Sequence, residues 1–166
     1  PRARVLVVDD EENIRHLLKT ILEQEGYRVR CAANGSEALD ILAREPYDQV
    51  LCDVRMPVMD GPAFLAEMVA RQIEATVIMM SAYGTIESAI EAMKAGAYDY
   101  VTKPFKRDEV VLTLRKAAER EQLRRENRRL RQEIEAGAAT GMVANSGPMR
   151  AILDLVAKVA PLDVTV

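Results

Sequence analysis

The sequence predicts an α/β fold, a doubly wound five-stranded parallel sheet followed by a long C-terminal helical linker. The first observation behind this prediction is that short apolar runs and amphipathic stretches alternate strictly, five times, along the chain. The second is that right-handed crossovers between five such strands favour the strand order 2-1-3-4-5. The third is that residues 110–136 contain no glycine or proline and are rich in charged side chains, which indicates one long helix.

The first two strand-and-helix units lie before residue 45. Residues 5–8 form an apolar strand that stops at the acidic run 9–12, and a helix follows from about Asn13 until Gly26 ends it. Its apolar stripe consists of Ile14, Leu17, Leu18, Ile21 and Leu22. The second strand is predicted at residues 27–32. Asn34-Gly35-Ser36 opens the second helix, whose apolar positions are Ala38, Leu39, Ile41 and Leu42.

The third unit is built around a mostly apolar run, residues 49–52, that ends on the carboxylate of Asp53. Such a run is typical of a central strand covered on both faces. Pro57 and the Asp60-Gly61 pair then turn the chain out of the sheet. Gly61 begins a helix that carries Phe64, Leu65 and Met68.

The last two units follow the same pattern. The fourth strand, residues 76–80, ends at Ser81, and the fifth, residues 98–102, ends at Lys103-Pro104-Phe105. Between them Thr85 opens a helix that Gly96 ends, with Ile86, Ala89, Ile90 and Met93 on its apolar side. The fifth helix begins near Arg107.

Composition narrows the class of protein. A hydrophobic fraction of 49% is ordinary for a globular protein, and no apolar run approaches the length of a membrane span. The net charge of −3 favours neither nucleic acid nor any other charged partner for the chain as a whole. Cys31 and Cys52 lack metal-ligand spacing and indicate free thiols in a reducing compartment. Residues 1–4 do not resemble a signal peptide, so we expect a cytoplasmic protein without membrane contact.

The predicted strand order brings three carboxylates together. Strands one and three are neighbours, so Asp9, Asp10 and Asp53 converge at the carboxyl edge of the sheet, where open α/β sheets bind ligands. Carboxylates crowded in this way repel each other unless a cation lies among them, and an all-oxygen site suits Mg²⁺. Ser81 and Lys103, at the ends of two further strands, add a hydroxyl and a positive charge. This set describes a receptor for a phosphoryl group with a carboxylate as nucleophile.

Each feature also has a simpler interpretation. The acidic run 9–12 could only place negative charge at the start of a helix. Asp53 could mark a strand end, Ser81 could cap the turn before the next helix, and Lys103 could be a solvated loop residue. All of them fall at the carboxyl ends of strands one, three, four and five, and this coincidence favours one common site.

Four segments of the sequence resemble the receiver domain of two-component response regulators. They are Val7-Val8-Asp9-Asp10-Glu11, Asp53-Val54-Arg55-Met56-Pro57-Val58-Met59-Asp60-Gly61, Ser81-Ala82-Tyr83-Gly84 and Lys103-Pro104-Phe105. The resemblance covers residues 1–118, which it identifies as a receiver domain with the CheY-like, or flavodoxin-like, fold. Serine stands at position 81, where the family often has threonine, and this keeps the hydroxyl.

The resemblance assigns roles to residues of this chain. It implies that Asp53 accepts a phosphoryl group from a partner histidine kinase. It further implies that Asp10 is a direct Mg²⁺ ligand, that Asp9 acts mainly through water, and that the backbone carbonyl of Arg55 is another ligand. The one histidine, His16, lies off the apolar stripe of its helix, so the phosphoryl donor is expected to be another protein.

The same resemblance extends to the switch that follows phosphorylation. It implies that Ser81 holds a phosphoryl oxygen after transfer and that Tyr100 changes rotamer with it. It also implies that the Lys103-Pro104 peptide is cis.

Residues 119–136 are predicted to form a helical coiled-coil linker. Leu123, Asn127, Leu130 and Ile134 are spaced alternately four and three apart, as in an a/d seam with asparagine at an a position. This spacing predicts a parallel homodimer through the linker helix, with the receiver face of the fourth and fifth helices as the alternative contact. A single solvated helix with scattered leucines would give the same short pattern. Interleaved arginines and glutamates, without aromatic residues, favour a paired helix over a nucleic-acid contact. Residues 137–147 are small and polar, which indicates a flexible connector.

Residues 148–166 combine a short amphipathic stretch with the start of a strand. They are similar to the entry of the AAA+ domain in activators of sigma-54 RNA polymerase of the NtrC/DctD type, although a generic C-terminal helix is the alternative. The glycine-rich nucleotide loop of that domain is not in the sequence, so we expect no ATPase and no enzyme beyond self-phosphorylation and dephosphorylation. Contacts with the polymerase and with DNA would belong to domains outside this sequence.

The sequence therefore predicts a phosphorylation-controlled regulator of transcription. A haloacid dehalogenase-type phosphatase also uses an aspartate nucleophile, Mg²⁺ and a lysine, but it has a second aspartate two residues after the nucleophile. Arg55 stands at that position here, and Asp53 follows the third strand and not the first. A receiver joined to a winged-helix DNA reader is a further alternative, which the long charged helix disfavours.

Overall fold

The structure is a computed structural model that describes residues 3–82 and 84–139. The chain divides into two compact units, Pro1–Gln122 and Leu123–Val166. The first unit holds the sheet and its helices, and the described part of the second is the continuation of the last helix. The segment predicted to begin a further domain, residues 148–166, lies outside the described residues, and the predicted domain boundaries stay predictions.

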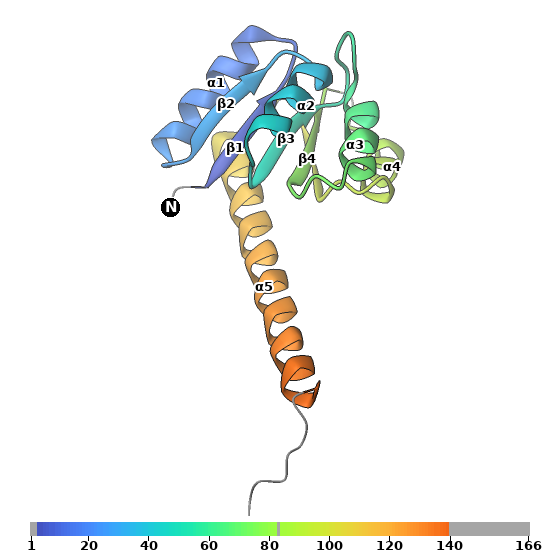
Figure 1. The fold of residues 1–166 in the computed structure, drawn as a ribbon. Helices are drawn as coiled ribbons and strands as arrows, with labels where there is room; N and C mark the ends of the chain where they lie inside the picture. The colour runs from blue at the N-terminus through green and yellow to red at the C-terminus, as the bar shows by residue number, and fades with distance from the viewer. Residues whose placement is uncertain (1–2, 83, 140–166) are drawn as a thin grey trace, which may run out of the picture. The chain divides into compact units, whose positions relative to one another are not determined.

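Five parallel strands form one sheet in the order β2-β1-β3-β4-β5 (Figure 1). The strands are β1 (Arg4–Val8), β2 (Arg28–Ala32), β3 (Gln49–Asp53), β4 (Thr76–Ser81) and β5 (Asp99–Thr102). This is the predicted doubly wound order, with β1 and β3 as neighbours, so the predicted fold is confirmed. Every residue of β3 is buried, as expected of a strand at the centre of a sheet covered on both faces.

Five helices connect and follow the strands. They are α1 (Glu12–Gln24), α2 (Gly35–Arg44), α3 (Gly61–Ala70), α4 (Ile86–Lys94) and α5 (Arg107–Ala139). Side-chain oxygens of Asn34, Asp60 and Thr85 accept the backbone N–H three residues on, which caps α2, α3 and α4. Gly26 and Gly96 follow α1 and α4 with φ of 89° and 110°, values that favour glycine after a helix.

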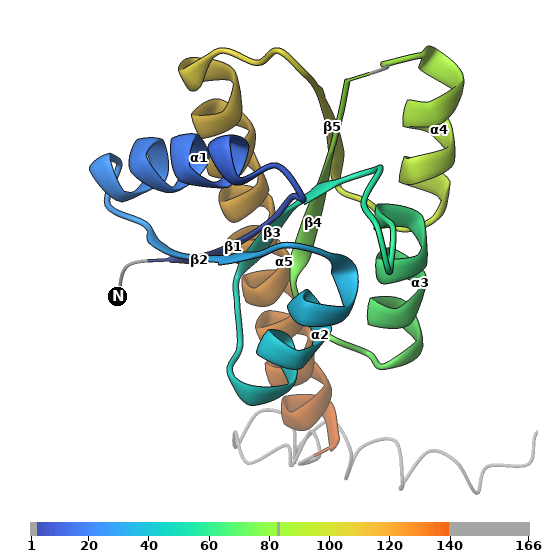
Figure 2. The same ribbon diagram turned by 90° about the horizontal axis from the view of Figure 1, so that it is seen from above.

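Two separate apolar cores cover the faces of the sheet, and Figure 2 shows the helices on either side of it. On one face α1 and α5 pack through residues such as Leu18 and Leu114. On the other face α2 and α3 pack through Leu39 and Phe64, and α4 adds only partly buried contacts. The cores hold the strands rigidly, so side chains at the strand ends are placed by the sheet itself.

The structure differs from the sequence prediction at three places. Leu17, which belongs to the predicted apolar stripe of α1, is 47% exposed and does not join the core. The predicted stripe of α4 is not a core face, because no α4 residue is buried and Ile86 is 77% exposed. Helix α5 continues through Gly137 to Ala139, past residue 136. None of the helices in the described ranges is long and apolar enough to cross a membrane.

Candidate functional site

The register of the sheet places Asp9 beside Asp53. Val8, the last residue of β1, pairs with Cys52 of β3, so the residue that follows each of them, a carboxylate in both cases, lies at the same level of the sheet edge. The N–H of Val54 donates to the carbonyl of Met80 (2.9 Å) and continues the ladder with β4 beyond Asp53. The carboxylate of Asp53 is therefore fixed at the carboxyl edge of the central strand.

The turn after β3 is held close to the acceptor carboxylate. The N–H of Gly61 donates to the carbonyl of Val54 (3.0 Å), which brings the start of α3 back against the strand end. A Cβ at position 61 would lie 2.5 Å from the carbonyl oxygen of Asp53, so only glycine fits this approach. The N–H of Arg55 donates to Asp53 Oδ2 (3.0 Å) and orients the carboxylate.

Lys103 joins two of the carboxylates. The Nζ atom of Lys103 lies 2.7 Å from Asp53 Oδ1 and 2.7 Å from Asp9 Oδ2, with Glu11 Oε1 farther away at 3.7 Å. Ser81 pairs with Thr102 across β4 and β5, and the N–H of Lys103 donates to the carbonyl of Ser81 (2.7 Å). This bond sets the point from which the lysine side chain reaches back to the centre of the sheet edge. The Lys103-Pro104 peptide is cis, as predicted.

Burial controls the electrostatics of this cluster. Asp9 is fully buried, and burial raises the pKa of its carboxyl above the ordinary value, although the Lys103 ammonium and the Glu11 N–H partly oppose this. Burial on its own lowers the pKa of Lys103, but its hydrogen bonds to Asp53 and Asp9 outweigh burial, so its pKa lies above the ordinary value. Lys103 is therefore a permanent cation at neutral pH, and it offsets the repulsion between the two carboxylates.

A pocket of about 260 Å³ opens beside these groups. Its lining residues are Asp10, Glu11, Asp53, Arg55, Ser81, Ala82 and Lys103. The carboxylate of Asp10 is exposed, in contrast to that of Asp9, which is enclosed. The pocket thus brings together five of the seven predicted site residues, and the other two, Asp9 and Tyr100, lie outside its lining.

The residues present fit a Mg²⁺ site. Within residues 3–82 and 84–139 there is no group of three or more acidic, histidine or cysteine side chains arranged to hold a metal ion. Mg²⁺ does not need such a group, because it takes one or two carboxylates, carbonyl oxygens and several waters. Asp10, Asp53 and Arg55 all line the pocket, and two carboxylates and a backbone carbonyl are oxygen donors of this kind.

Other predicted residues lie as follows. Ser81 is buried and faces the pocket, as the predicted phosphoryl contact requires. Tyr100 is partly buried, and its hydroxyl lies 3.3 Å from Ser88 Oγ of α4. His16 is exposed on α1, as expected of a surface residue. Cys52 is fully buried, which raises the pKa of its thiol well above the ordinary value, so it is an unreactive packed thiol.

Sequence reasoning missed two side chains at this edge. Glu11 lines the pocket and lies within ion-pair distance of Lys103. Arg15 of α1 donates from Nη1 to the backbone carbonyls of Asp9 (2.6 Å) and Asp10 (2.9 Å). A basic residue one turn into the helix that follows an acidic loop is the sequence signal that could have drawn attention to Arg15.

The sequence is similar to a known family and to known regulatory proteins. The model of the response regulator receiver domain matches residues 5–115. The chain is 40% identical to the regulatory protein AtoC of Escherichia coli over 152 residues. This alignment covers 92% of this chain and 32% of AtoC. It is also 40% identical to the transcriptional regulatory protein ZraR of Klebsiella oxytoca, over 98% of this chain and 36% of ZraR. The chain thus spans about a third of the length of these curated relatives.

Solved structures show the same likeness. The receiver domain of the Francisella response regulator 1452 superposes with a TM-score of 0.70 at 35% identity, covering 72% of this chain and 99% of that one. The crystal structure of NtrX from Brucella abortus gives a TM-score of 0.76 at 35% identity, over 97% of this chain and 35% of that chain.

Proposed function

Because the chain belongs to the receiver domain family of two-component response regulators, we propose that it is a phosphorylation switch whose phosphoryl group is carried by Asp53. Response regulators receive this group from histidine kinases, and the receiver domain is not itself an enzyme family. The relatives AtoC and ZraR bear the names of regulatory proteins. A histidine kinase as the partner of this chain is part of the proposal.

One observation carries the proposal: Lys103 Nζ lies 2.7 Å from Asp53 Oδ1, and both residues line a pocket that Ser81 and Asp10 also line. A largely enclosed lysine on the acceptor carboxylate places a positive charge where a transferred phosphoryl group would carry negative charge. A structural ion pair alone would not need the adjoining hydroxyl, the exposed second carboxylate and the open pocket.

The chemistry follows from the donors present. A carboxylate oxygen of Asp53 attacks phosphorus and forms the P–O bond of an acyl phosphate, while the bond from phosphorus to the donor breaks and its electron pair leaves with the donor. Lys103 and the hydroxyl of Ser81 are placed to hold the phosphoryl oxygens. The N–H of Arg55 keeps the carboxylate of Asp53 oriented toward the pocket.

Receiver domains generally bind Mg²⁺ at the phosphorylation site. We assign Asp10, Asp53 and the backbone carbonyl of Arg55 as direct ligands here, with Asp9 acting through water. Bound Mg²⁺ would neutralise charge on the phosphoryl oxygens during transfer. Asp9 is fully buried against Lys103, which supports the indirect role.

The test of this function is phosphorylation by a small phosphoryl donor such as acetyl phosphate. Intact-mass measurement is expected to show one added phosphoryl group per chain in the presence of Mg²⁺ and none after chelation of the metal. The group should be lost on treatment with hydroxylamine, because acyl phosphates react with this nucleophile. A stable, Mg²⁺-independent modification would contradict the proposal.

A second prediction separates the two adjacent aspartates. Asp10→Ala removes an exposed direct ligand and is expected to abolish Mg²⁺ binding. Asp9→Ala removes only a contact that orients the site and is expected to weaken binding about 10–100-fold. Calorimetric titration measures both affinities, and equal affinities of the parent and Asp10→Ala would exclude Asp10 as a ligand.

The proposed output follows from the relatives and the linker. We propose that the full-length protein is a sigma-54-dependent activator, and that its polymerase and DNA contacts belong to domains outside this sequence. Linker residues 119–136 would join the receiver to those domains and pair in a parallel homodimer. Leu123, Leu130 and Ile134 support pairing, because they are 61%, 46% and 70% exposed and form an apolar strip at coiled-coil spacing.

The dimer is tested by sedimentation of the chain against the Leu123→Glu/Leu130→Glu variant. The variant is expected to be monomeric, since burying each such side chain is worth about 1.5–3 kcal/mol and carboxylates reverse the gain. Leu112→Glu, on the receiver part of α5 and also 53% exposed, is the matched control and should still dimerise. If only Leu112→Glu dissociates, the dimer contact lies on the receiver domain and the linker is a spacer.

A further inference from the structure

We propose that Arg15 is a positioning residue for the Mg²⁺ ligands, an inference that rests on the proposed function. One nitrogen of its guanidinium, Nη1, donates to the carbonyl oxygens of Asp9 (2.6 Å) and Asp10 (2.9 Å). These two residues lie in the three-residue connection between β1 and α1. The side chain thus holds the backbone of both aspartates from the helix that follows them.

The two aspartates differ in how much they depend on this contact. Asp9 is fixed in several other ways, because its Oδ1 accepts the N–H of Glu11 (2.9 Å) and its Oδ2 accepts Lys103 Nζ (2.7 Å). The carboxylate of Asp10 is exposed at the pocket and makes no hydrogen bond or ion pair within residues 3–82 and 84–139. Its direction is therefore set by the backbone, and Arg15 is the side chain that holds that backbone.

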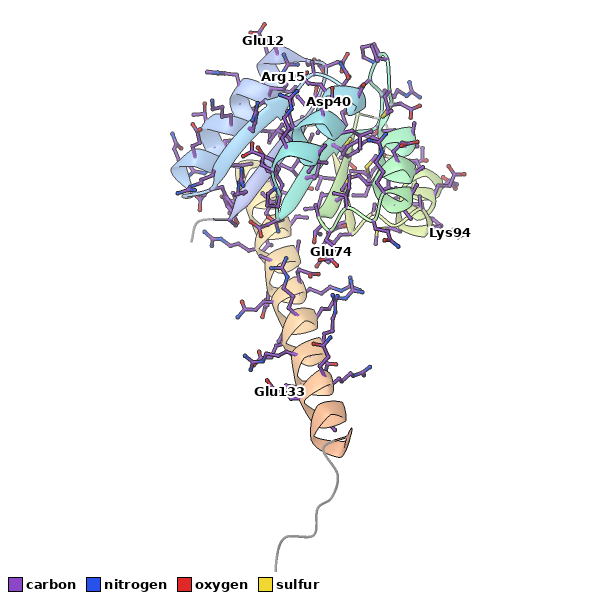
Figure 3. All side chains as sticks on the ribbon, viewed as in Figure 1. Glu12, Arg15, Asp40, Glu74, Lys94 and Glu133 are labelled. Carbon is purple, nitrogen blue, oxygen red and sulfur yellow. The ribbon has the colours of Figure 1, made fainter. Side chains whose placement is uncertain are left out.

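The position of Arg15 suits this role. It lies on the first full turn of α1, is half-buried, and its own N–H donates to the carbonyl of Glu11 (3.1 Å). In Figure 3 Arg15 and Glu12 lie at the same end of the domain, opposite Glu74, which precedes β4. Bonds from an ionised donor to a carbonyl are stronger than neutral ones, so the contact can hold a loop against the repulsion of three nearby carboxylates.

Removal of Arg15 should change the Mg²⁺ affinity in one direction if the residue acts only through its charge, and in the other direction if it positions the ligands. This difference makes the inference testable. As a bare charge, the Arg15 guanidinium repels a metal cation, so its removal would tighten Mg²⁺ binding. As a support for the ligand backbone, its removal would weaken binding, as the loss of a group that orients a metal ligand does.

Calorimetric titration with Mg²⁺ alone gives the measurement, because the chain has no tryptophan to report binding by fluorescence. Arg15→Met keeps an unbranched side chain of high helix propensity and is expected to weaken Mg²⁺ binding about 10–100-fold. Arg15→Lys should restore part of the affinity, since one ammonium can donate to both carbonyls from a shorter stem. Lys19→Met, one turn farther along α1 and exposed, is the matched control and should bind as the parent does.

The dependence of the phosphorylation rate on Mg²⁺ concentration is a second measurement. A purely structural role of Arg15 would not change this dependence. With acetyl phosphate the rate of Arg15→Met should fall at low Mg²⁺ and return to that of the parent at saturating Mg²⁺. If Arg15→Met does not fold, as judged by circular dichroism, Arg15→Lys carries the test and should still bind more weakly than the parent.

Binding by Arg15→Met that is equal to or tighter than the parent's would overturn the inference, as would a rate defect undiminished at saturating metal. Failure of the parent itself to bind Mg²⁺ would instead contradict the proposed function, so the two failures are distinguishable.

Discussion

Asp53→Asn is expected to abolish phosphorylation by acetyl phosphate, with the added mass falling to background at saturating Mg²⁺. The amide has no anionic oxygen to attack phosphorus, so the nucleophile itself is lost. The fold should survive, because an amide oxygen can still accept the N–H of Arg55 and the change is nearly isosteric. Lys103 keeps its ion pair with Asp9 (2.7 Å), and loss of the Asp53 charge removes a repulsion on Asp9, so we expect the variant to stay folded.

The matched control is Asp60→Asn, a carboxylate seven residues away at the other end of the same turn. Asp60 caps α3 by accepting the N–H of Ala63 (2.9 Å), and asparagine caps as well as aspartate does. This control should be phosphorylated at the rate of the parent. Undiminished labelling of Asp53→Asn would remove Asp53 from the acceptor role.

Lys103→Met is expected to lower the free energy of unfolding by about 3–5 kcal/mol near neutral pH, the usual effect of removing one partner of a buried ion pair. The lysine side chain is 11% exposed and neutralises Asp9, which is fully buried, and Asp53. Methionine fills a similar volume, so the loss reports the stranded carboxylates more than a cavity. Urea unfolding followed by circular dichroism gives the value.

The sign of the pH dependence follows from the pKa directions. The pKa of Lys103 is raised in the folded protein, so its stabilisation is fully present below the unfolded pKa of 10.5 and is lost only as pH rises through the folded value. The pKa of Asp9 is already raised by burial, and loss of the ammonium raises it further. Between pH 3.8 and this raised pKa, Asp9 holds a proton in the folded variant that it has released in the unfolded chain. The variant therefore gains stability as pH falls toward 3.8.

The difference in the free energy of unfolding between the parent and Lys103→Met should therefore become smaller as pH falls from neutral to about pH 4. Lys106→Met, an exposed lysine three residues on, is the matched control and should change stability little at either pH. A pH-independent loss in Lys103→Met would indicate that packing, and not the carboxylates, is what Lys103 supplies.

The sheet and most of the site could be predicted because both follow from short-range signals. The apolar run before Asp53 ends in a carboxylate and a turn, and strand order then follows from the handedness of the crossovers. Once β1 and β3 are neighbours, the pairing of Val8 with Cys52 leaves Asp9 and Asp53 little freedom to be elsewhere. The positions of Ser81 and Lys103 follow in the same way from β4 and β5.

The remaining features depend on contacts that periodicity does not encode. An apolar stripe on α4 predicts a buried face, but Ile86, Ile90 and Met93 are 77%, 47% and 45% exposed, because α4 only partly covers the sheet. Leu17 is a comparable case on α1. The contact of Arg15 with the carbonyls of Asp9 and Asp10 depends on a loop conformation and a rotamer, neither of which the residue types determine.

The most direct test of the central claim is to locate the phosphoryl group itself. The chain is phosphorylated with acetyl phosphate and Mg²⁺, the acyl phosphate is reduced with borohydride, and the peptides are sequenced by mass spectrometry. Reduction converts a phosphorylated aspartate into homoserine, so homoserine is predicted at position 53 and at no other aspartate. Homoserine at Asp9, Asp10 or Asp60 with aspartate intact at position 53 would contradict the account.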